Sequence, residues 1–318
     1  MPATDEPLSR GSRIAYRTSA ALLRRRLQAG TEMTPAAYRF VRLFDNGARM
    51  LRTPGCSRER VGLPGFDIEI LRATTEFVPL RDGVVLYLHG GGFVCCGLNT
   101  HRPIVARLSR LTGLPAVGVD YRQLPHAPFT QSIDDCLTAY RWLLDHGADP
   151  ERIVFAGDSA GGYLVFATTQ RALAAGLPAP AGLVGISALL DLDCTIKADS
   201  ALRFGDPFGY PPAFSGIVEA GIAGEENRLA LSPVEGPLDQ MPPSLLITAE
   251  SEFLRADSEL MAYRLRSMGR DCTLEVWPGQ LHAFPASLPF LPESRAATRR
   301  IAEFVRDRVG SRTTAPQV

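Results

Sequence analysis

Residues 153–162 read IVFAGDSAGG, and this stretch decides the fold. The four apolar residues predict a buried strand, the glycines at 157 and 161 permit a sharp turn, and residues 163–174 suit a helix. Ser159 stands at the apex of the turn, where a strand-turn-helix motif would push its hydroxyl out above a sheet. Serine is also a preferred first residue of a helix, so a plain helix cap is the alternative interpretation.

Short apolar runs alternate with longer amphipathic segments from about residue 68 to residue 309. This alternation predicts an α/β fold in which helices cover both faces of a mostly parallel central sheet. We expect strands at residues 67–71, 84–88, 116–119, 153–156, 183–186, 245–248 and 273–276.

Two stretches fall outside this alternation. Residues 8–50 predict two helices, and residues 191–239 form an insertion too long for an ordinary loop. Such insertions at one edge of a sheet usually form a lid, although a packing appendage or, for the first stretch, a membrane-surface helix is the alternative. We therefore expect an N-terminal helical cap segment (1–55), a core in two parts (56–190 and 240–310), a cap insertion (191–239) and a disordered tail (311–318).

The composition limits the kinds of partner. Lys plus Arg and Asp plus Glu both number 34 in 318 residues, so the formal charge of zero gives no electrostatic footprint for nucleic acid. We expect a small substrate without strong charge. No segment of signal-peptide type or of bilayer-spanning length occurs, so we expect a cytoplasmic protein without stable membrane insertion. A homodimer is compatible with the sequence.

Six cysteines, at positions 56, 95, 96, 136, 194 and 272, show no zinc-binding spacing. We expect free thiols, no metal and no organic cofactor. The adjacent Cys95 and Cys96 could form a strained bridge or include a reactive thiol, but we interpret them as small apolar wall residues.

A second glycine-rich segment, HGGGF at residues 89–93, directly follows the strand expected at 84–88. Consecutive glycines allow backbone N–H groups to turn inward, which suits the binding of a developing oxyanion. A serine nucleophile also needs a base, and His282 is the only histidine after Ser159. It follows the last expected strand, at the edge of the sheet where the carboxyl ends of parallel strands gather.

The base in turn needs a carboxylate, and three candidates follow the strand expected at 245–248: Glu250, Glu252 and Asp257. We prefer Glu252, because it lies just past the strand end and gives the order Ser, acid, His. Asp257 looks like the N-cap of the next helix.

Five ordered motifs together resemble the hormone-sensitive-lipase-like family of bacterial esterases and lipases, a branch of the α/β-hydrolases. They are HGGGF at 89–93, DYRQLP at 120–125, GDSAGG at 157–162, EFLR at 252–255 and HAF at 282–284. The resemblance covers roughly residues 68–309 and implies an α/β-hydrolase fold. It also implies a helical cap built from an N-terminal segment and a late insertion.

Carried over by position, the resemblance implies that Ser159 is the nucleophile, His282 the general base and Glu252 its orienting acid. The oxyanion hole would be the backbone amides of Gly91, Gly92 and Ala160, while His89 would brace the glycine loop. Two positions depart from the family pattern, which usually has Asp at 252 and Gly at 283. The extra methylene of Glu252 must be absorbed by a shifted loop or a different approach to the imidazole, and Ala283 limits the local backbone.

These residues predict a serine carboxylesterase that acts on short to medium acyl, apolar esters through an acyl-enzyme. An amidase or carbamate hydrolase with the same residues is the alternative, because nothing in the sequence separates ester from amide. A non-catalytic small-molecule receptor on the same fold is disfavoured by the complete triad. The expected pocket wall is apolar and consists of Phe93, Cys95, Cys96, Phe204, Phe208, Tyr210 and Phe214.

Overall fold

A single eight-stranded sheet forms the centre of the protein. The computed structural model describes residues 9–14, 18, 45–50, 53–73, 76–194, 197, 211–225 and 231–310. The strands are β1 (Ser57–Leu63), β2 (Phe66–Arg72), β3 (Val84–Leu88), β4 (Ala116–Val119), β5 (Ile153–Asp158), β6 (Gly182–Ile186), β7 (Ser244–Ala249) and β8 (Cys272–Trp277). Their order is β1-β2-β4-β3-β5-β6-β7-β8. The six strands β3 to β8 are parallel to one another, while β2 pairs antiparallel with both β1 and β4. The expected mostly parallel sheet is confirmed.

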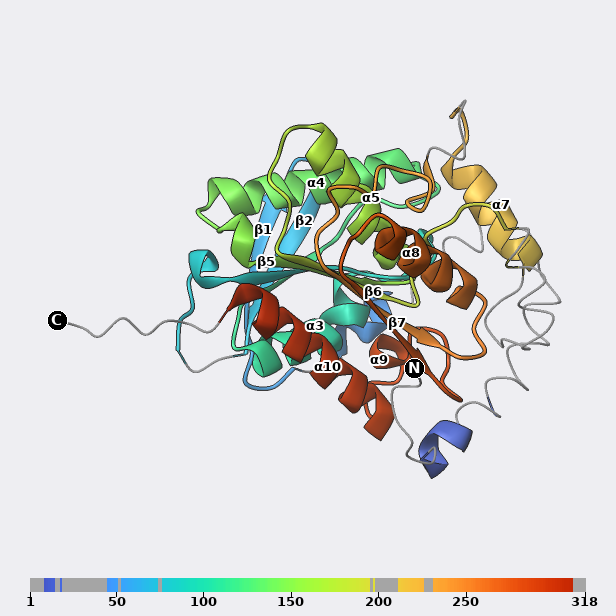
Figure 1. Ribbon diagram of the computed structural model, residues 1–318. Helices are drawn as coiled ribbons and strands as arrows, with labels where there is room; N and C mark the ends of the chain where they lie inside the picture. The colour runs from blue at the N-terminus through green and yellow to red at the C-terminus, as the bar shows by residue number, and fades with distance from the viewer. Residues whose placement is uncertain are drawn as a thin grey trace.

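Helices cover both faces of this sheet (Figure 1). On one face lie α4 (Phe129–Asp145), α5 (Ala160–Ala174) and α8 (Arg255–Ser267), and on the other lie α3 (Leu98–Thr112), α9 (Phe284–Ser287) and α10 (Pro292–Val309). Two cores result, because successive side chains of a strand point to opposite faces. Leu86 packs with the α4 and α5 side, whereas its neighbour Tyr87 packs with the α3 and α10 side.

The described elements also include three short 3₁₀ helices and one further α-helix. The 3₁₀ helices are η1 (Ala48–Met50), η2 (Leu80–Asp82) and η3 (Pro150–Arg152). Helix α7 (Pro211–Gly221) belongs to the expected cap insertion and lies beside the end of the α8 layer, outside the three-layer core (Figure 1). No helix in the described ranges is both long and apolar enough to cross a bilayer.

The seven expected strands all occur, most of them one or two residues longer than expected, but β1 was missed. It reads SRERVGL, and its first four residues are exposed because it lies at the edge of the sheet. An edge strand buries little on either face, so it carries no apolar pattern to recognise. The helix expected at 163–174 begins three residues earlier, at Ala160.

Most of the expected N-terminal cap segment, the tail at 311–318 and part of the cap insertion lie outside the described residues. Residues 9–12 of the N-terminal segment contact α10. The backbone N–H of Ser9 donates to Glu293 Oε1 at 2.7 Å, and Ser12 Oγ donates to Glu293 Oε2 at 2.7 Å.

Candidate active site

Ser159 stands in a strained turn between β5 and α5. Its backbone has φ 55° and ψ −117°, a conformation that few non-glycine residues adopt. The turn is possible only because its glycines lack side chains. A Cβ on Gly157 would lie 2.5 Å from the carbonyl oxygen of Gly161, and one on Gly161 would lie 1.9 Å from the carbonyl oxygen of Leu88.

The Ser159 side chain does not cap helix α5, which was the alternative interpretation of this serine. Ser159 does occupy the N-cap position of α5, but its side chain makes no capping hydrogen bond. The backbone holds the turn instead, since Ser159 N–H donates to the Ile186 carbonyl at 2.8 Å and its own carbonyl accepts from Tyr163 N–H at 3.1 Å. The hydroxyl is therefore not used to cap α5.

The glycine loop after β3 lies against this turn. Gly91 and Gly92 have φ values of 122° and 61°, which favour glycine. The Gly91 carbonyl accepts from the backbone N–H groups of Val94 and Cys95, both at 3.1 Å. Because the first N–H groups of a helix have no intrahelical acceptor, Ala160 N–H at the start of α5 is available to a ligand.

Asp158 fastens the glycine loop to the turn that carries Ser159. Its Oδ1 accepts from Gly90 N–H at 3.1 Å and from the Tyr87 hydroxyl at 2.8 Å. His101 Nε2 lies 3.3 Å from the same carboxylate. The fit is close, since a Cβ on Gly90 would lie 2.2 Å from Asp158 Oδ2. The relative position of the glycine loop and Ser159 is thus set by one buried carboxylate.

The two histidines of this network differ in charge. Burial alone would lower the pKa of His101, but the Asp158 carboxylate raises it to about 9, so the imidazole is protonated at neutral pH. Burial, together with that nearby charge, lowers the pKa of His89 to about 4. His89 Nδ1 donates to the Gly90 carbonyl at 2.7 Å, and its ring stacks on Tyr121 with the centroids 4.3 Å apart. Its expected bracing role fits these contacts.

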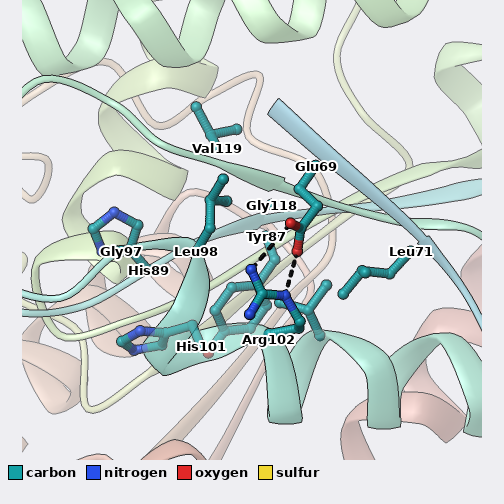
Figure 2. Close-up of a pocket in the computed structure, with 11 residues that line it drawn as sticks. Glu69, Leu71, Tyr87, His89, Gly97, Leu98, His101, Arg102, Gly118 and Val119 are labelled. Carbon is teal, nitrogen blue, oxygen red and sulfur yellow. Dashed lines mark hydrogen bonds and ion pairs between the residues drawn. The ribbon is translucent and has the colours of Figure 1, made fainter. Parts of the chain in front are cut away.

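A small cavity lies behind the glycine loop (Figure 2). His89, His101 and Tyr87 line it, together with the buried ion pair in which Arg102 Nε donates to Glu69 Oε2 at 2.7 Å. Neither Ser159 nor His282 lines this cavity. We therefore assign it to the support of the loop and not to substrate.

On the other side of Ser159, β7 and β8 bring an acid and a base together. His282 Nδ1 lies 2.8 Å from Glu252 Oε2. The Glu252 side chain is 1% exposed and that of His282 is 19% exposed. The other carboxylate oxygen, Oε1, accepts from Ala249 N–H at 2.8 Å and from the Thr248 hydroxyl. The longer side chain of Glu folds back onto its own strand end, which explains how the extra methylene is accommodated.

Asp257 and Glu250, the other candidate acids, do different things. Asp257 is not the N-cap of α8, which begins at Arg255 after Leu254. Its buried Oδ2 accepts from the backbone N–H groups of Leu190 and Asp191 at 2.8 and 2.9 Å and pairs with Lys197 Nζ at 2.9 Å. Asp257 therefore anchors the loop after β6. Glu250 is exposed.

Ser187, which the sequence motifs did not indicate, connects the two sides of the site. It follows β6, is fully buried and has φ 48°. Its Oγ accepts from Ala283 N–H, next to His282, at 2.9 Å. Leu189 N–H, two residues further on, donates to the Ser159 carbonyl at 3.1 Å. The loop after β6 thus holds the backbone of both Ser159 and the segment that carries His282.

Helix α7 lies close both to the glycine loop and to the segment that carries Glu252. A Cβ on Gly92 would lie 4.0 Å from Ile217 Cδ1, so this helix lies close to the glycine loop. Phe214 contacts Phe253, the neighbour of Glu252, with ring centroids 5.2 Å apart. Ile217 and Phe253 were not among the expected pocket residues, because no motif marks an apolar side chain that reaches a site from a distant segment.

The expected pocket residues separate into three groups. Phe93 is 1% exposed and stacks on Phe129 with centroids 3.9 Å apart, so its side chain packs into the core. Cys95, Cys96 and Phe214 are half-buried. Phe204, Phe208 and Tyr210 lie outside the described residues. All six cysteines are free, and no cluster of three or more His, Cys, Asp or Glu side chains suited to a metal occurs in the part of the chain that the structure describes.

Comparison with known proteins adds a family and an activity to this geometry. Residues 85–286 match the family model described as alpha/beta hydrolase fold. A carboxylesterase/phospholipase of Mycobacterium tuberculosis, LipF, is 35% identical in an alignment that covers 98% of this chain and 86% of LipF.

Two solved structures have the same architecture over nearly the whole chain. The crystal structure of EstE5 superposes with a TM-score of 0.84 at 30% identity, covering 95% of this chain and 100% of its own. An esterase from the bacterial hormone-sensitive lipase family gives a TM-score of 0.82 at 32% identity, covering 93% of this chain and 98% of its own.

Proposed function

The chain belongs to the alpha/beta-hydrolase family and is a carboxylic ester hydrolase, and from this premise we propose that Ser159, His282 and Glu252 carry out its reaction. The observation that carries this proposal is the 2.8 Å contact between His282 Nδ1 and Glu252 Oε2, which follow β8 and β7 at the same end of the parallel strands as the strained Ser159 turn after β5. The reaction is acyl transfer to water through an ester of Ser159.

The contact with Glu252 determines which nitrogen of His282 acts as the base. An ionised carboxylate can only accept hydrogen bonds, so Nδ1 carries the proton in this pair. The lone pair of the neutral imidazole is then on Nε2, which takes the proton of Ser159 Oγ during attack on the ester carbonyl. Glu252 is itself fixed by Ala249 N–H and the Thr248 hydroxyl, so it holds the ring in one orientation.

The oxyanion formed by this attack would be bound by the backbone amides of Gly91, Gly92 and Ala160. Such preorganised donors act where charge develops and account for much of the rate enhancement in acyl transfer. The imidazolium then protonates the departing alkoxide, and water repeats the cycle on the acyl-enzyme. Every proton in this scheme is moved by His282.

We assign the expected cap, built from the N-terminal segment and the insertion at 191–239, to substrate selection. Support comes from α7, whose Ile217 lies near Gly92 and whose Phe214 contacts Phe253. Apolar side chains over the site favour an uncharged acyl group, and their proximity to the glycine loop limits its length. The substrates would therefore be apolar esters of short to medium acyl chains.

Two variants and a substrate series test this function. Hydrolysis of p-nitrophenyl butyrate should fall at least 1,000-fold in Ser159→Ala, while Ser267→Ala, which changes an exposed serine on α8, should match the wild type. Rates across p-nitrophenyl esters should peak at short to medium chains and fall for long ones. Undiminished hydrolysis by Ser159→Ala would refute the proposed nucleophile.

An ester and its matching amide test the leaving group. We expect p-nitrophenyl acetate to be turned over much faster than p-nitroacetanilide, because an amine needs stronger protonation by His282 to leave. Comparable rates for the two would favour the amidase alternative.

A further inference from the structure

Two adjacent thiols follow the oxyanion glycines. Cys95 and Cys96 lie in the same loop as Gly91 and Gly92, and both are free and half-buried, whereas Cys136 and Cys272 are buried. Their Sγ atoms are 3.7 Å apart. A disulfide requires about 2.05 Å, so the observed pair is a dithiol.

The separation of the two sulfurs fits a single soft atom bonded to both. With bonds of about 2.3 Å, the length of a zinc–sulfur bond, and a near-tetrahedral angle, such an atom holds two sulfurs about 3.8 Å apart. Soft ligands such as thiolates select soft acceptors. Across the described ranges, however, no third His, Cys, Asp or Glu completes a metal-binding cluster. An acceptor that needs only two protein ligands therefore fits best.

We propose that Cys95 and Cys96 form a dithiol modification site that takes a monosubstituted trivalent arsenical, and that ligation there stops ester hydrolysis. In the reaction R–As=O loses its oxygen, two S–H bonds break and two As–S bonds form. The two protons leave with the oxygen as one water, and nothing is oxidised or reduced. Arsenic then holds its own substituent and two sulfurs, with no further protein ligand.

The thiols are chemically unequal, which favours stepwise capture. Cys96 hydrogen-bonds to Cys95, and this interaction lowers the pKa of the Cys95 thiol although burial opposes it. The same interaction, with burial, raises the pKa of the Cys96 thiol. The thiolate is the nucleophile, so Cys95 forms the first bond and Cys96 closes the ring.

Ligation would reach the catalytic site through Gly91. Cys95 donates to the Gly91 carbonyl twice, from its backbone N–H at 3.1 Å and from Sγ at 3.2 Å. The Cys95 carbonyl is so close that a Cβ on Gly91 would lie 2.0 Å from its oxygen. Bridging replaces the Cys95 S–H by a bond to arsenic and so removes the Sγ hydrogen bond to the Gly91 carbonyl, which displaces the amides of Gly91 and Gly92. The consequence for activity rests on the proposed oxyanion role of these glycines.

The test is titration of the intact protein with phenylarsine oxide. One equivalent should bind, blocking both thiols of the peptide that contains Cys95 and Cys96, and p-nitrophenyl butyrate hydrolysis should fall at least tenfold. Excess 2,3-dimercaptopropanol should restore activity, whereas the same concentration of 2-mercaptoethanol should not, because only a dithiol competes for both bonds. Cys56→Ser, which alters a half-buried thiol just before β1, should titrate like the wild type.

Cys95→Ser and Cys96→Ser should each need at least tenfold more arsenical to lose the same fraction of their own untreated activity. If either variant fails to fold, peptide mapping of the labelled wild type decides the site. Binding at other cysteines, or reversal by the monothiol, would overturn the dithiol site. A bridged protein with full activity would overturn only the link to the glycine loop. Neither result bears on the Ser159→Ala test of the proposed function.

Discussion

On one side of Ser159, Asp158 binds only fixed groups, namely the Gly90 amide, the Tyr87 hydroxyl and His101. On the other side, Glu252 binds His282, a partly exposed imidazole that gains and loses a proton in each cycle of the proposed mechanism. Both carboxylates are buried, yet one holds a backbone in place and the other contacts the imidazole that we propose as the base. The difference teaches that burial of a charge does not reveal its role, whereas the exposure and chemistry of its partner do.

The largest expected effect comes from neutralising Glu252, the carboxylate that contacts His282. Glu252→Gln should lower kcat by about 10⁴-fold, because the amide neither selects the tautomer with a proton on Nδ1 nor stabilises the imidazolium. Steady-state kinetics with p-nitrophenyl butyrate measure this, and circular dichroism checks that the fold is kept.

Asp257→Asn is the matched control for this variant. Like Glu252, Asp257 is a buried carboxylate after β7, but it anchors the loop after β6 and does not contact His282. Its loss should therefore lower stability while kcat stays within about tenfold of the wild type. If the two variants exchanged these phenotypes, Asp257 would be the orienting acid and our assignment wrong.

The next effect concerns Asp158, the carboxylate that holds the glycine loop. Asp158→Asn should lower the free energy of unfolding by about 3 kcal/mol, since it breaks a buried charge pair with His101. It should also lower kcat about tenfold to hundredfold with little change in KM, because the oxyanion amides shift while substrate binding is kept. Urea unfolding and a kcat-against-KM comparison measure the two parts. An unchanged kcat would mean that the glycine loop is held without Asp158.

Sequence patterns could predict the sheet because buried parallel strands are continuous apolar runs, as in IVFA at 153–156. The same holds for the candidate site as far as it depends on chain order: Ser159, Glu252 and His282 follow the ends of β5, β7 and β8, three parallel strands of which β7 and β8 are paired and β5 is separated from β7 by β6. Strand β1 could not be found, because an exposed edge strand needs no apolar side chains.

The supporting residues could not be predicted for a different reason. His101 lies on α3, 57 positions before Asp158, and Ser187 reaches Ala283 across 96 positions. Such contacts depend on how helices and loops pack, which local sequence does not encode. Asp257 resembled a helix cap because Asp is common there. Its actual partners, Leu190, Asp191 and Lys197, come from the segment after β6.

A further effect concerns how stability depends on pH, because His101 lies beside Asp158. The pKa of His101 is raised to about 9 in the folded protein, above its ordinary value of 6.5. The folded state therefore holds a proton that the unfolded state loses between these values, and stability falls as pH rises through this window. The stabilisation, about 3 kcal/mol, is fully present below pH 6.5 and lost above pH 9.

The variant His101→Gln should remove this part of the pH dependence. Urea unfolding of both proteins at several values between pH 6 and pH 10 measures it. If the free energy of unfolding changed with pH in parallel for the two proteins, a charged His101 beside Asp158 would be contradicted.

The smallest effect concerns the backbone of Ala283, the residue after His282. Ala283 has φ 50° and ψ 35°, a left-handed conformation that costs a non-glycine residue about 1 kcal/mol. Ala283→Gly should therefore raise the free energy of unfolding by up to about 1 kcal/mol and leave kcat nearly unchanged, since the N–H that donates to Ser187 Oγ is kept. Thermal unfolding measures the gain. A clear loss of stability would show that the methyl group contributes more than the strain costs.

The central claim is that Ser159 becomes acylated with help from His282 and Glu252. The most direct test is to react the protein with a p-nitrophenyl alkylphosphonate, which forms a stable ester with an activated serine, and to map the adduct by peptide mass spectrometry. We predict one adduct per chain, on Ser159, formed orders of magnitude more slowly in Glu252→Gln. An adduct on another residue such as Ser187, or equal labelling rates in the two proteins, would contradict the account.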